Sequence, residues 1–225
     1  MLNVSRLSCA RSVFFCLLLI AAGSTAEAQT SQTALDHQLS RIDLGIVGVG
    51  VFNKSSNGTA TVNGKANTPV NLNPSNTAGA LITIRYTKSP FVGLEFNYSY
   101  ARYTQNFTPF GSQPNGGVQQ NASEYTFGYV VHSKKDYFGF TPFVSGGAGT
   151  TVFRPTPRGG LGLPEQARAT YFASVGAETL LSRHFGIRLQ YRQLFFKAPD
   201  FETNYLRIEQ HTSSYEPGLG FFLRF

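Results

Sequence analysis

The segment HTSSYE, residues 211–216, brings together the residue types of a serine acyl-transfer site. Such a site needs a serine nucleophile, a histidine base within hydrogen-bond reach and a carboxylate that orients the imidazole. His211, Ser213 and Glu216 are of these three types. Three residue types at loose spacing are a weak signal. The alternative interpretation is a polar loop at the outer end of a strand, and we predict no catalytic residues.

A second group of chemically capable residues consists of charges on alternate positions of stretches whose opposite face is aliphatic and aromatic. The group comprises Arg85, Glu95, Glu178, Arg188 and Arg192. A lone buried charge is expensive, so charges that share an interior face must pair with one another or meet trapped water. We therefore predict that these five side chains form an interior ion-pair network.

Tight turns set the approximate register of this network. A turn near residue 89 places Glu95 diagonally across from Arg85, and a turn near residue 184 places Glu178 diagonally across from Arg188 and Arg192. Diagonal neighbours on paired strands are within reach of long side chains. The sequence therefore predicts that Glu178 serves both arginines of the later strand.

No pattern predicts a cofactor or a metal. The glycine-rich segments at 147–151 and 158–164 lack the lysine and the helix context of a phosphate-binding loop. The acidic residues are scattered, with no cluster suited to calcium. Both cysteines, Cys9 and Cys16, lie near the N-terminus within a segment that is expected to be removed, so no thiolate ligand or nucleophile remains.

The N-terminus has the pattern of an export signal. Arg6 and Arg11 precede an apolar run at 13–22, and a small-x-small site ends at Ala28. We predict a signal peptide at 1–28, cleavage after Ala28, and a short periplasmic lead at 29–40. An exported chain seldom meets nucleic acid, so we expect no nucleic-acid partner. The formal net charge of +7 favours anionic surfaces such as lipopolysaccharide phosphates.

Beyond this signal the chain alternates with period two, which is the pattern of strands. We predict eight strands, at about 41–52, 77–87, 91–103, 122–132, 138–153, 168–181, 186–197 and 213–225. Their connections alternate between short turns and long segments rich in Gly, Asn, Pro and Ser, at 53–76, 104–121, 154–167 and 198–212. This alternation is typical of an outer-membrane barrel with short periplasmic turns and long outer loops. We expect 53–76 to be mobile.

The faces of the strands indicate which solvent surrounds the sheet. In the third predicted strand Val92, Leu94 and Phe96 share one face, whereas Glu95 and Asn97 share the other. Apolar-out, polar-in alternation fits a closed sheet in lipid, and a hydrophobic fraction of 41% fits a barrel in which only alternate residues meet lipid. A soluble β-sandwich or barrel, the alternative, would turn its charges outward. Both faces of the first strand are apolar, so its register stays open.

These observations predict an all-β fold over 41–225, an eight-stranded antiparallel up-and-down transmembrane β-barrel. An even number of strands places both termini on the periplasmic side of a bacterial outer membrane. Eight strands leave an interior that side chains fill, so we predict a lumen plugged by charged residues. A narrow gated conduit is the alternative.

The last strand, YEPGLGFFLRF, ends the chain on an apolar alternation. Its predicted lipid-facing residues are Tyr215, Leu219, Phe221, Leu223 and Phe225. Gly218, Gly220 and Arg224 fall between them and face the lumen or its mouth.

Taken together, these features resemble the small outer-membrane β-barrel families, the OmpA-like and OmpX-like barrels. The segments LSRHFGIRLQYR and FTPFVSGGAG are similar to sequences common in the outer-membrane β-barrel domain, and the resemblance covers about residues 40–225. It implies delivery by periplasmic chaperones, insertion by the barrel assembly machinery, which recognises the last strand, and contact with outer-membrane lipid and lipopolysaccharide. It names no extracellular ligand.

The resemblance leaves three functions to weigh. Barrels of this size serve as structural components or surface-interaction proteins, and this non-enzymatic role is our prediction. A small gated, porin-like channel is the first alternative. A lipid A-modifying enzyme is the second, because a His-x-Ser pattern with a later Glu occurs in lipid A deacylases. Here the Glu follows Ser213 at a shorter spacing, and the Asn that usually follows the Ser is missing.

Overall fold

The structure is a computed structural model that describes residues 39–62, 65–89, 91–108, 117–201 and 206–225. The predicted signal peptide, its cleavage site and most of the lead at 29–40 lie outside these residues. The strands are β1 (Ile42–Asn53), β2 (Ser56–Val62), β3 (Lys65–Pro74), β4 (Thr77–Thr87), β5 (Val92–Thr108), β6 (Gly117–His132), β7 (Thr141–Pro155), β8 (Gln166–Leu180), β9 (Phe185–Lys197), β10 (Leu206–Arg207) and β11 (His211–Arg224). Within the described part of the chain, no helix has the length and apolar character needed to cross a membrane.

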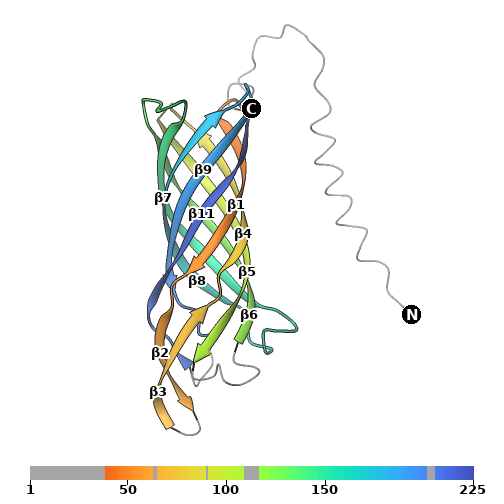
Figure 1. The fold of residues 1–225 in the computed structure, drawn as a ribbon, viewed down its shortest axis with the longest axis vertical. Helices are drawn as coiled ribbons and strands as arrows, with labels where there is room; N and C mark the ends of the chain where they lie inside the picture. Colours follow the sequence, from red (N-terminus) through yellow and green to blue (C-terminus); the bar gives the residue numbers. More distant parts are fainter. Residues whose placement is uncertain (1–38, 63–64, 90, 109–116, 202–205) are drawn as a thin grey trace, which may run out of the picture. The chain divides into compact units, whose positions relative to one another are not determined.

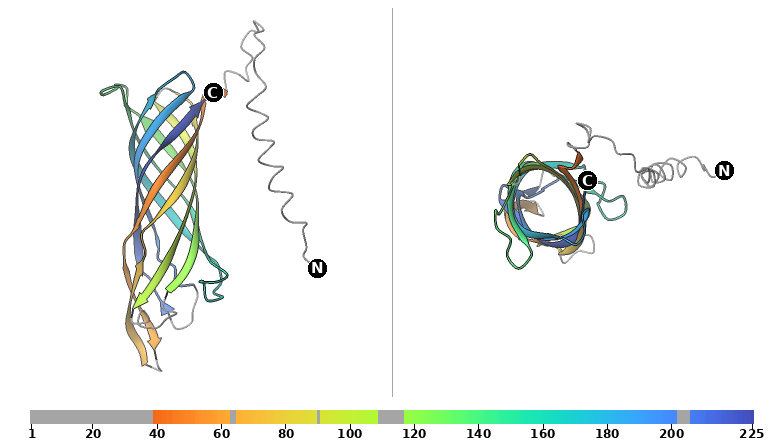
Figure 2. Two further views of the ribbon diagram at one scale, coloured as in Figure 1. Left: turned by 45° about the vertical axis from the view of Figure 1, so that its right-hand side comes forward. Right: turned by 90° about the horizontal axis from the view of Figure 1, so that it is seen from above.

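Eight of these strands close into an antiparallel barrel (Figure 1). The ring runs β1-β4-β5-β6-β7-β8-β9-β11, and β11 pairs with β1, where Ile46 lies opposite Phe221. Seen along its axis the sheet is a continuous ring (Figure 2). Closure leaves no unpaired edge in the wall, which is the condition for a sheet in lipid. The predicted fold class is confirmed.

The barrel has two ends with different connections. At the terminus end, where Ile42 begins β1 and Arg224 ends β11, the connections are the turns 88–91, 133–140 and 181–184. Phe225 donates its backbone N–H to the carbonyl of Ile42, and Arg224 donates to the carbonyl of His184. At the opposite loop end the connections are longer, but the predicted loop at 104–121 is corrected, because β5 continues to Thr108 and β6 begins at Gly117.

The interpretation of 53–76 as a long connecting loop is corrected at this loop end, whereas its mobility stays a prediction. Outside residues 63–64, which are not among those described, the segment forms the hairpin β2–β3 rather than an irregular loop. β3 pairs with the outer part of β5, with Leu72 opposite Phe107, and β10 pairs with β2. Gly58 permits this approach, since a Cβ there would lie 2.5 Å from the carbonyl oxygen of Arg207. The order therefore comes from partners distant in sequence.

A second correction concerns the start of the fifth predicted strand. We expected it at 138, but β7 begins at Thr141. Phe138 and Gly139 have φ angles of +54° and +81°, so they form a turn instead of extended chain. Tyr137 and Phe140 close this turn through reciprocal backbone hydrogen bonds of 2.8 and 3.0 Å. A two-residue turn with both φ angles positive is a type I′ hairpin turn.

The predicted faces of the strands are confirmed. On β5, Phe96 is 40% exposed outward, whereas Glu95 is 3% exposed within the lumen. The open register of β1 is now settled: Val47, Val49 and Val51 are buried in the lumen, and Ile46 lies on the outer face.

Candidate functional site: the charged lumen and its apolar surroundings

Four of the five predicted interior charges meet in one cluster near the terminus end. Arg85 Nε lies 2.9 Å from Glu95 Oε2, and Arg85 Nη1 lies 3.1 Å from Glu178 Oε2. Arg188 Nη2 lies 2.9 Å from the same Glu178 oxygen and 3.0 Å from Asp43 Oδ1. We call the set of Asp43, Arg85, Glu95, Glu178 and Arg188 the terminal cluster. All are 5% exposed or less, so each arginine meets its carboxylates with little water to screen them.

Aromatic rings complete the surroundings of the terminal cluster. The guanidinium carbon of Arg85 lies 4.2 Å from the ring centroid of Phe143, and that of Arg188 lies 4.8 Å from the ring of Phe222. Both rings are buried in the lumen. Gly176 leaves the space for one of them, since a Cβ there would lie 2.5 Å from the Phe143 ring. Arginine combines carboxylate pairing with such stacking, which lysine does less well.

The terminal cluster opens toward the end of the barrel at a polar mouth. His132 Nε2 lies 3.3 Å from Glu178, and Arg224 Nη2 lies 3.4 Å from the same carboxylate. A cavity of about 440 Å³ lies here, lined by Arg41, Lys88, His132, Glu178, Arg224 and nearby serine and threonine side chains.

The fifth predicted charge, Arg192, belongs to a separate central cluster. Its Nη2 lies 2.6 Å from Glu124 Oε1, and its Nη1 lies 2.8 Å from Glu216 Oε2. The expected pairing of Arg192 with Glu178 is wrong. β9 places Arg188, not Arg192, opposite Glu178, because the two strands pair directly at that level and Arg192 falls opposite Ser174.

The expected diagonal geometry is wrong for the terminal cluster as well. Arg85 lies directly opposite Glu95 across β4 and β5, and Glu178 lies directly opposite Arg188 across β8 and β9. The turn lengths set this register, and a shift of two residues converts a diagonal contact into a direct one without changing the face of either side chain. The residue types were sufficient to find these pairs but not their alignment.

Several residues that complete the clusters and the mouth were not predicted as members of the ion-pair network, although Arg224 was expected to face the lumen or its mouth; they are Asp43, Glu124, His132, Glu216 and Arg224. Asp43 lies on β1, whose register the sequence left open, and it reaches Arg188 across the closing pair of strands. Glu124 meets Arg192 across the lumen, from β6 to β9. Contacts across a barrel depend on its closure and its tilt, which alternation within single strands does not report.

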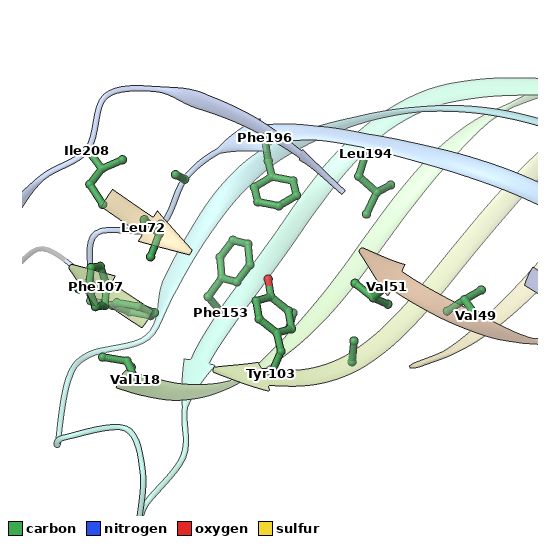
Figure 3. Packing of buried hydrophobic residues seen from close by; sticks show 14 of the residues in the cluster. Val49, Val51, Leu72, Tyr103, Phe107, Val118, Phe153, Leu194, Phe196 and Ile208 are labelled. Atoms are coloured by element: carbon green, nitrogen blue, oxygen red, sulfur yellow. The ribbon is translucent and has the colours of Figure 1, made fainter. Parts of the chain in front are cut away.

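The lumen changes character toward the loop end. Buried apolar side chains from the wall pack there against residues from the loop-end connections (Figure 3). Phe153 and Phe196 from the wall have ring centroids 5.4 Å apart, and Leu72 from β3 and Ile208 from the connection before β11 belong to the same buried cluster. We call this the apolar cap, formed by Val49, Val51, Leu72, Tyr103, Phe107, Val118, Phe153, Leu194, Phe196, Phe201 and Ile208.

One polar latch holds the 198–210 connection in the cap. Asp200 Oδ1 accepts hydrogen bonds of 2.9 Å from both Gln166 and Arg168. Gln166 in turn accepts the backbone N–H groups of Asp200 and Phe201. Phe201 is 1% exposed, so the latch fixes a ring inside the cap.

The outer wall carries a continuous apolar belt around the charged part of the lumen. Its large outward side chains are at least 37% exposed and include Ile46, Ile82, Phe96, Phe127, Tyr129, Val144, Val175, Leu189, Leu219 and Phe221. On β5 the belt covers 92–100, which matches the roughly 9–11 residues that a tilted strand needs to cross a bilayer. Such exposure in water would be an aggregation liability.

Beyond the belt, the inner and outer faces exchange their chemistry. On β5 the outward positions change from Tyr100 to Arg102 and Asn106, and the inward positions change from Glu95 to Tyr103. On β6 the outward series likewise passes from aromatic residues at 125–129 to Gln119. The wall is thus apolar outside in one zone and apolar inside in the next.

The last strand presents its predicted residues as expected from alternation. Leu219, Phe221, Leu223 and Phe225 are 45–61% exposed on the outer face. Tyr215 is partly exposed and stacks on Tyr191, with ring centroids 6.4 Å apart. Whether this strand is an assembly signal stays a prediction.

The residues of the acyl-transfer pattern do not assemble into a triad. Glu216 is committed to Arg192 inside the lumen, and His211 is exposed. Among the described residues, no hydrogen bond joins His211 to Ser213, and no group of three or more His, Cys, Asp or Glu side chains is placed to hold a metal ion.

The fold and this lumen define the class of small eight-stranded barrels known from outer membranes. The outer membrane protein OprG of Pseudomonas aeruginosa is similar, with a TM-score of 0.60 at 11% identity over 82% of this chain and 95% of that chain. Neisserial surface protein A is similar as well, with a TM-score of 0.53 at 8% identity over 82% and 97%. No protein-family model matches the sequence, and no curated protein matches it. The likeness is therefore one of fold.

Proposed function

We propose that this chain is an integral protein of a bacterial outer membrane, with a closed interior and a structural or surface-interaction role through its loop end. The observation that carries the proposal is the belt together with the exchange of faces beyond it. On β5, apolar residues face outward only at 92–100, around a charged lumen, and polar residues replace them on the outer face toward the loop end. A wall that passes from lipid into water requires this change.

The lengths of the connections support one orientation. In this proposal the terminus end, with its short turns, lies in the periplasm, and the loop end lies outside the cell. The signal peptide predicted at 1–28 supplies export. Outer-membrane lipid and lipopolysaccharide contact the belt, and the apolar last strand, ending at Phe225, is offered to periplasmic chaperones and the barrel assembly machinery.

Closure of the interior is supported at three levels. The terminal cluster, the central cluster and the apolar cap follow one another along the lumen. The cavity between the central cluster and the cap measures only about 20 Å³, roughly the space for one water molecule. We expect that solutes do not pass while the cap is in place.

Two measurements on the full-length exported protein test this proposal. A band that migrates differently in unboiled and boiled samples of the membrane fraction is expected of a closed barrel, and an unchanged band contradicts it. Purified protein in planar bilayers is expected to give no steady conductance. Steady, sizeable currents would refute the closed interior while leaving the barrel itself intact.

A small gated channel is the second candidate, and one observation favours it. Gln105, Gln190 and Ser214, at successive levels of the lumen, each keep a buried polar side-chain atom without a hydrogen-bond partner in the protein. Such atoms are normally satisfied, so a polar path with its own water molecules would suit them. Opening this path would require release of the apolar cap.

The latch at Asp200 gives a direct test of this second candidate. Asp200→Ala removes the acceptor of Gln166 and Arg168. If the protein is a gated channel, this variant conducts ions where the native protein is silent. Asp136→Ala is the matched control, because Asp136 also accepts a side-chain hydrogen bond, from Thr141, but in a turn at the other end. If neither variant conducts ions, the interpretation of the protein as a gated channel is rejected.

A further inference from the structure

The turn between β6 and β7 differs from the other two turns of the terminus end. It occupies 133–140 and projects sideways from the barrel wall, which both views of the barrel show (Figures 1 and 2). Every residue at 134–140 is exposed. A turn that merely joins two strands needs only about two residues. The additional length places side chains outside the circumference of the barrel.

The tip of this turn holds a large apolar side chain in an unfavourable backbone conformation. Phe138 has φ +54° and is fully exposed, at 103%. The first central position of a type I′ turn favours Asn, Asp or Gly, because other side chains crowd the backbone at positive φ. Phenylalanine here is thus disfavoured by its backbone and by its exposure to water. A residue held against both effects points to a function at that position.

The side chains around the tip combine aromatic rings with cations. Tyr137 and Phe140 are 56% and 42% exposed. Lys134 and Lys135 are exposed as well, and Lys134 Nζ lies 5.1 Å from the ring centroid of Phe91 on the neighbouring turn. Aromatic residues beside lysines are the composition of segments that lie at a membrane interface, where rings reach the acyl boundary and ammonium groups reach phosphates.

This patch is continuous with the apolar belt. Tyr129 and Val131, on the strand that enters the turn, are 64% and 44% exposed on the outer face, and Val144, on the strand that leaves it, is 54% exposed. The projecting turn therefore lies at the edge of the surface that we assign to lipid, rather than over the mouth of the lumen. Lipid is the one partner that already surrounds its base.

We propose that the β6–β7 turn is a lipid-interface anchor. Phe138 inserts at the boundary between headgroups and acyl chains of the leaflet at the terminus end, and Lys134 and Lys135 contact phospholipid phosphates. The proposal rests on the proposed membrane location of the barrel. It goes further by assigning a binding role, and a ligand class, to a turn outside the wall.

The experiment uses tryptophan as a depth probe, because the chain contains none. Phe138→Trp is folded into phosphatidylcholine vesicles with and without brominated acyl chains. The anchor predicts blue-shifted emission and strong quenching by the brominated lipid. The matched control is Leu161→Trp at the loop end, where Leu161 and Gly162 have φ +54° and +68° and Leu161 is 53% exposed. The tryptophan of this control is expected to emit as in water, with quenching several times weaker.

The outcomes separate the anchor from the barrel. A gel band that shifts on heating verifies that each variant has folded. If the native protein also lacked this shift, the proposed function itself would be contradicted. A folded Phe138→Trp barrel whose tryptophan is exposed to iodide and unquenched by brominated lipid overturns the anchor alone. Protection from both quenchers would indicate a protein partner or a second copy, which also overturns it.

The two lysines are tested in the same system with phosphatidylglycerol as the brominated component. Because anionic headgroups gather near cations, the tryptophan of the Phe138→Trp variant should be quenched more by brominated phosphatidylglycerol than by an equal fraction of brominated phosphatidylcholine. Replacement of Lys134 and Lys135 by Gln should abolish the difference and leave the depth unchanged. An equal preference in both proteins would remove the lysines from the anchor.

Discussion

We call the part of the barrel inside the apolar belt the belt zone, and the part around the apolar cap the cap zone. The two zones are built from the same strands, but their apolar residues lie on opposite faces of the wall. In the belt zone β5 turns Phe96 outward and Glu95 inward; in the cap zone it turns Arg102 outward and Tyr103 inward. The backbone is continuous and its pleat does not change, so only the residue types exchange. The solvent outside the wall therefore decides which face is apolar. The lumen holds charged residues where the outer face is apolar, and apolar residues where the outer face is polar.

The difference also separates two ways of filling a narrow lumen. In the belt zone, the outer face, which we assign to lipid, takes the apolar residues, so the charges are buried in the lumen and each is matched by an opposite charge. In the cap zone, water outside frees the interior to be an ordinary hydrophobic core, with Phe153 and Phe196 in contact. Loss of one partner should be costly in both zones, but for electrostatic reasons in the first and packing reasons in the second.

The largest expected effect is at Arg188 in the terminal cluster. Arg188→Met removes the nearest cation of Asp43, which then has only Arg224 Nη2 at 3.9 Å, and one of the two buried arginines that pair with Glu178. Removing one partner of a buried ion pair costs about 3–5 kcal/mol, because the remaining charge stays desolvated. Urea unfolding of the barrel in detergent micelles measures this loss. Arg102→Met, on the outer face of the cap zone, is the control and should change stability by less than about 0.5 kcal/mol.

The next effect tests the cap zone. Phe153→Ala removes a ring that is fully buried against Phe196. A Phe→Ala cavity costs about 3–5 kcal/mol in a packed core. If the two zones are distinct cooperative units, amide hydrogen exchange should accelerate on the order of a hundredfold in the cap strands and stay unchanged in the belt. Uniform acceleration along β5 would mean that the barrel opens as one unit.

The same division separates the features that the sequence predicts from those that it does not. On β4 and β8 the charged residues fall on the face opposite a run of outward apolar residues, so the interior positions of Arg85 and Glu178 could be predicted from the pattern, although Leu81 and Phe172 point inward as well. In β1 the inward residues are Val47, Val49 and Val51, opposite an outer face that is apolar as well. When both faces are apolar, the alternation does not indicate which residues point inward, so the register of that strand could not be predicted.

Ion-pair partners on strands far apart in the sequence could not be predicted from the sequence. Asp43 and Arg188 are 145 residues apart and meet only because β11 joins β1 to β9. The hairpin β2–β3 was missed for a related reason. Its sequence is rich in Asn, Ser and Thr and alternates only over the short run 70–74, and the strands are completed by pairing with β5 and β10.

The outer faces give a third and somewhat smaller contrast. Phe96→Arg places a cation in the belt, whereas Asn106→Arg places it on the same strand in the cap zone. An arginine on the lipid face of a barrel costs about 2–4 kcal/mol near the bilayer centre and about 0–1 kcal/mol near its edge. Folding equilibria in lipid vesicles should show this difference, and in detergent the gap should shrink. Equal costs at both positions would contradict the assigned belt.

The smallest effect concerns two ion pairs of equal length in the two zones. Arg154 Nε and Glu165 Oε2 are 2.8 Å apart on the cap exterior, as are Arg192 Nη1 and Glu216 Oε2 in the lumen. The exterior side chains are 63% and 59% exposed, the interior ones 2% and 4%. Water and salt screen the exterior pair, so a double-mutant cycle with Arg154→Ala and Glu165→Ala should give no resolvable coupling. The interior cycle with Arg192→Met and Glu216→Gln should give coupling on the order of 1–3 kcal/mol that survives added salt. Equal couplings would mean that distance, and not the surroundings that distinguish the two zones, governs the energy of these pairs.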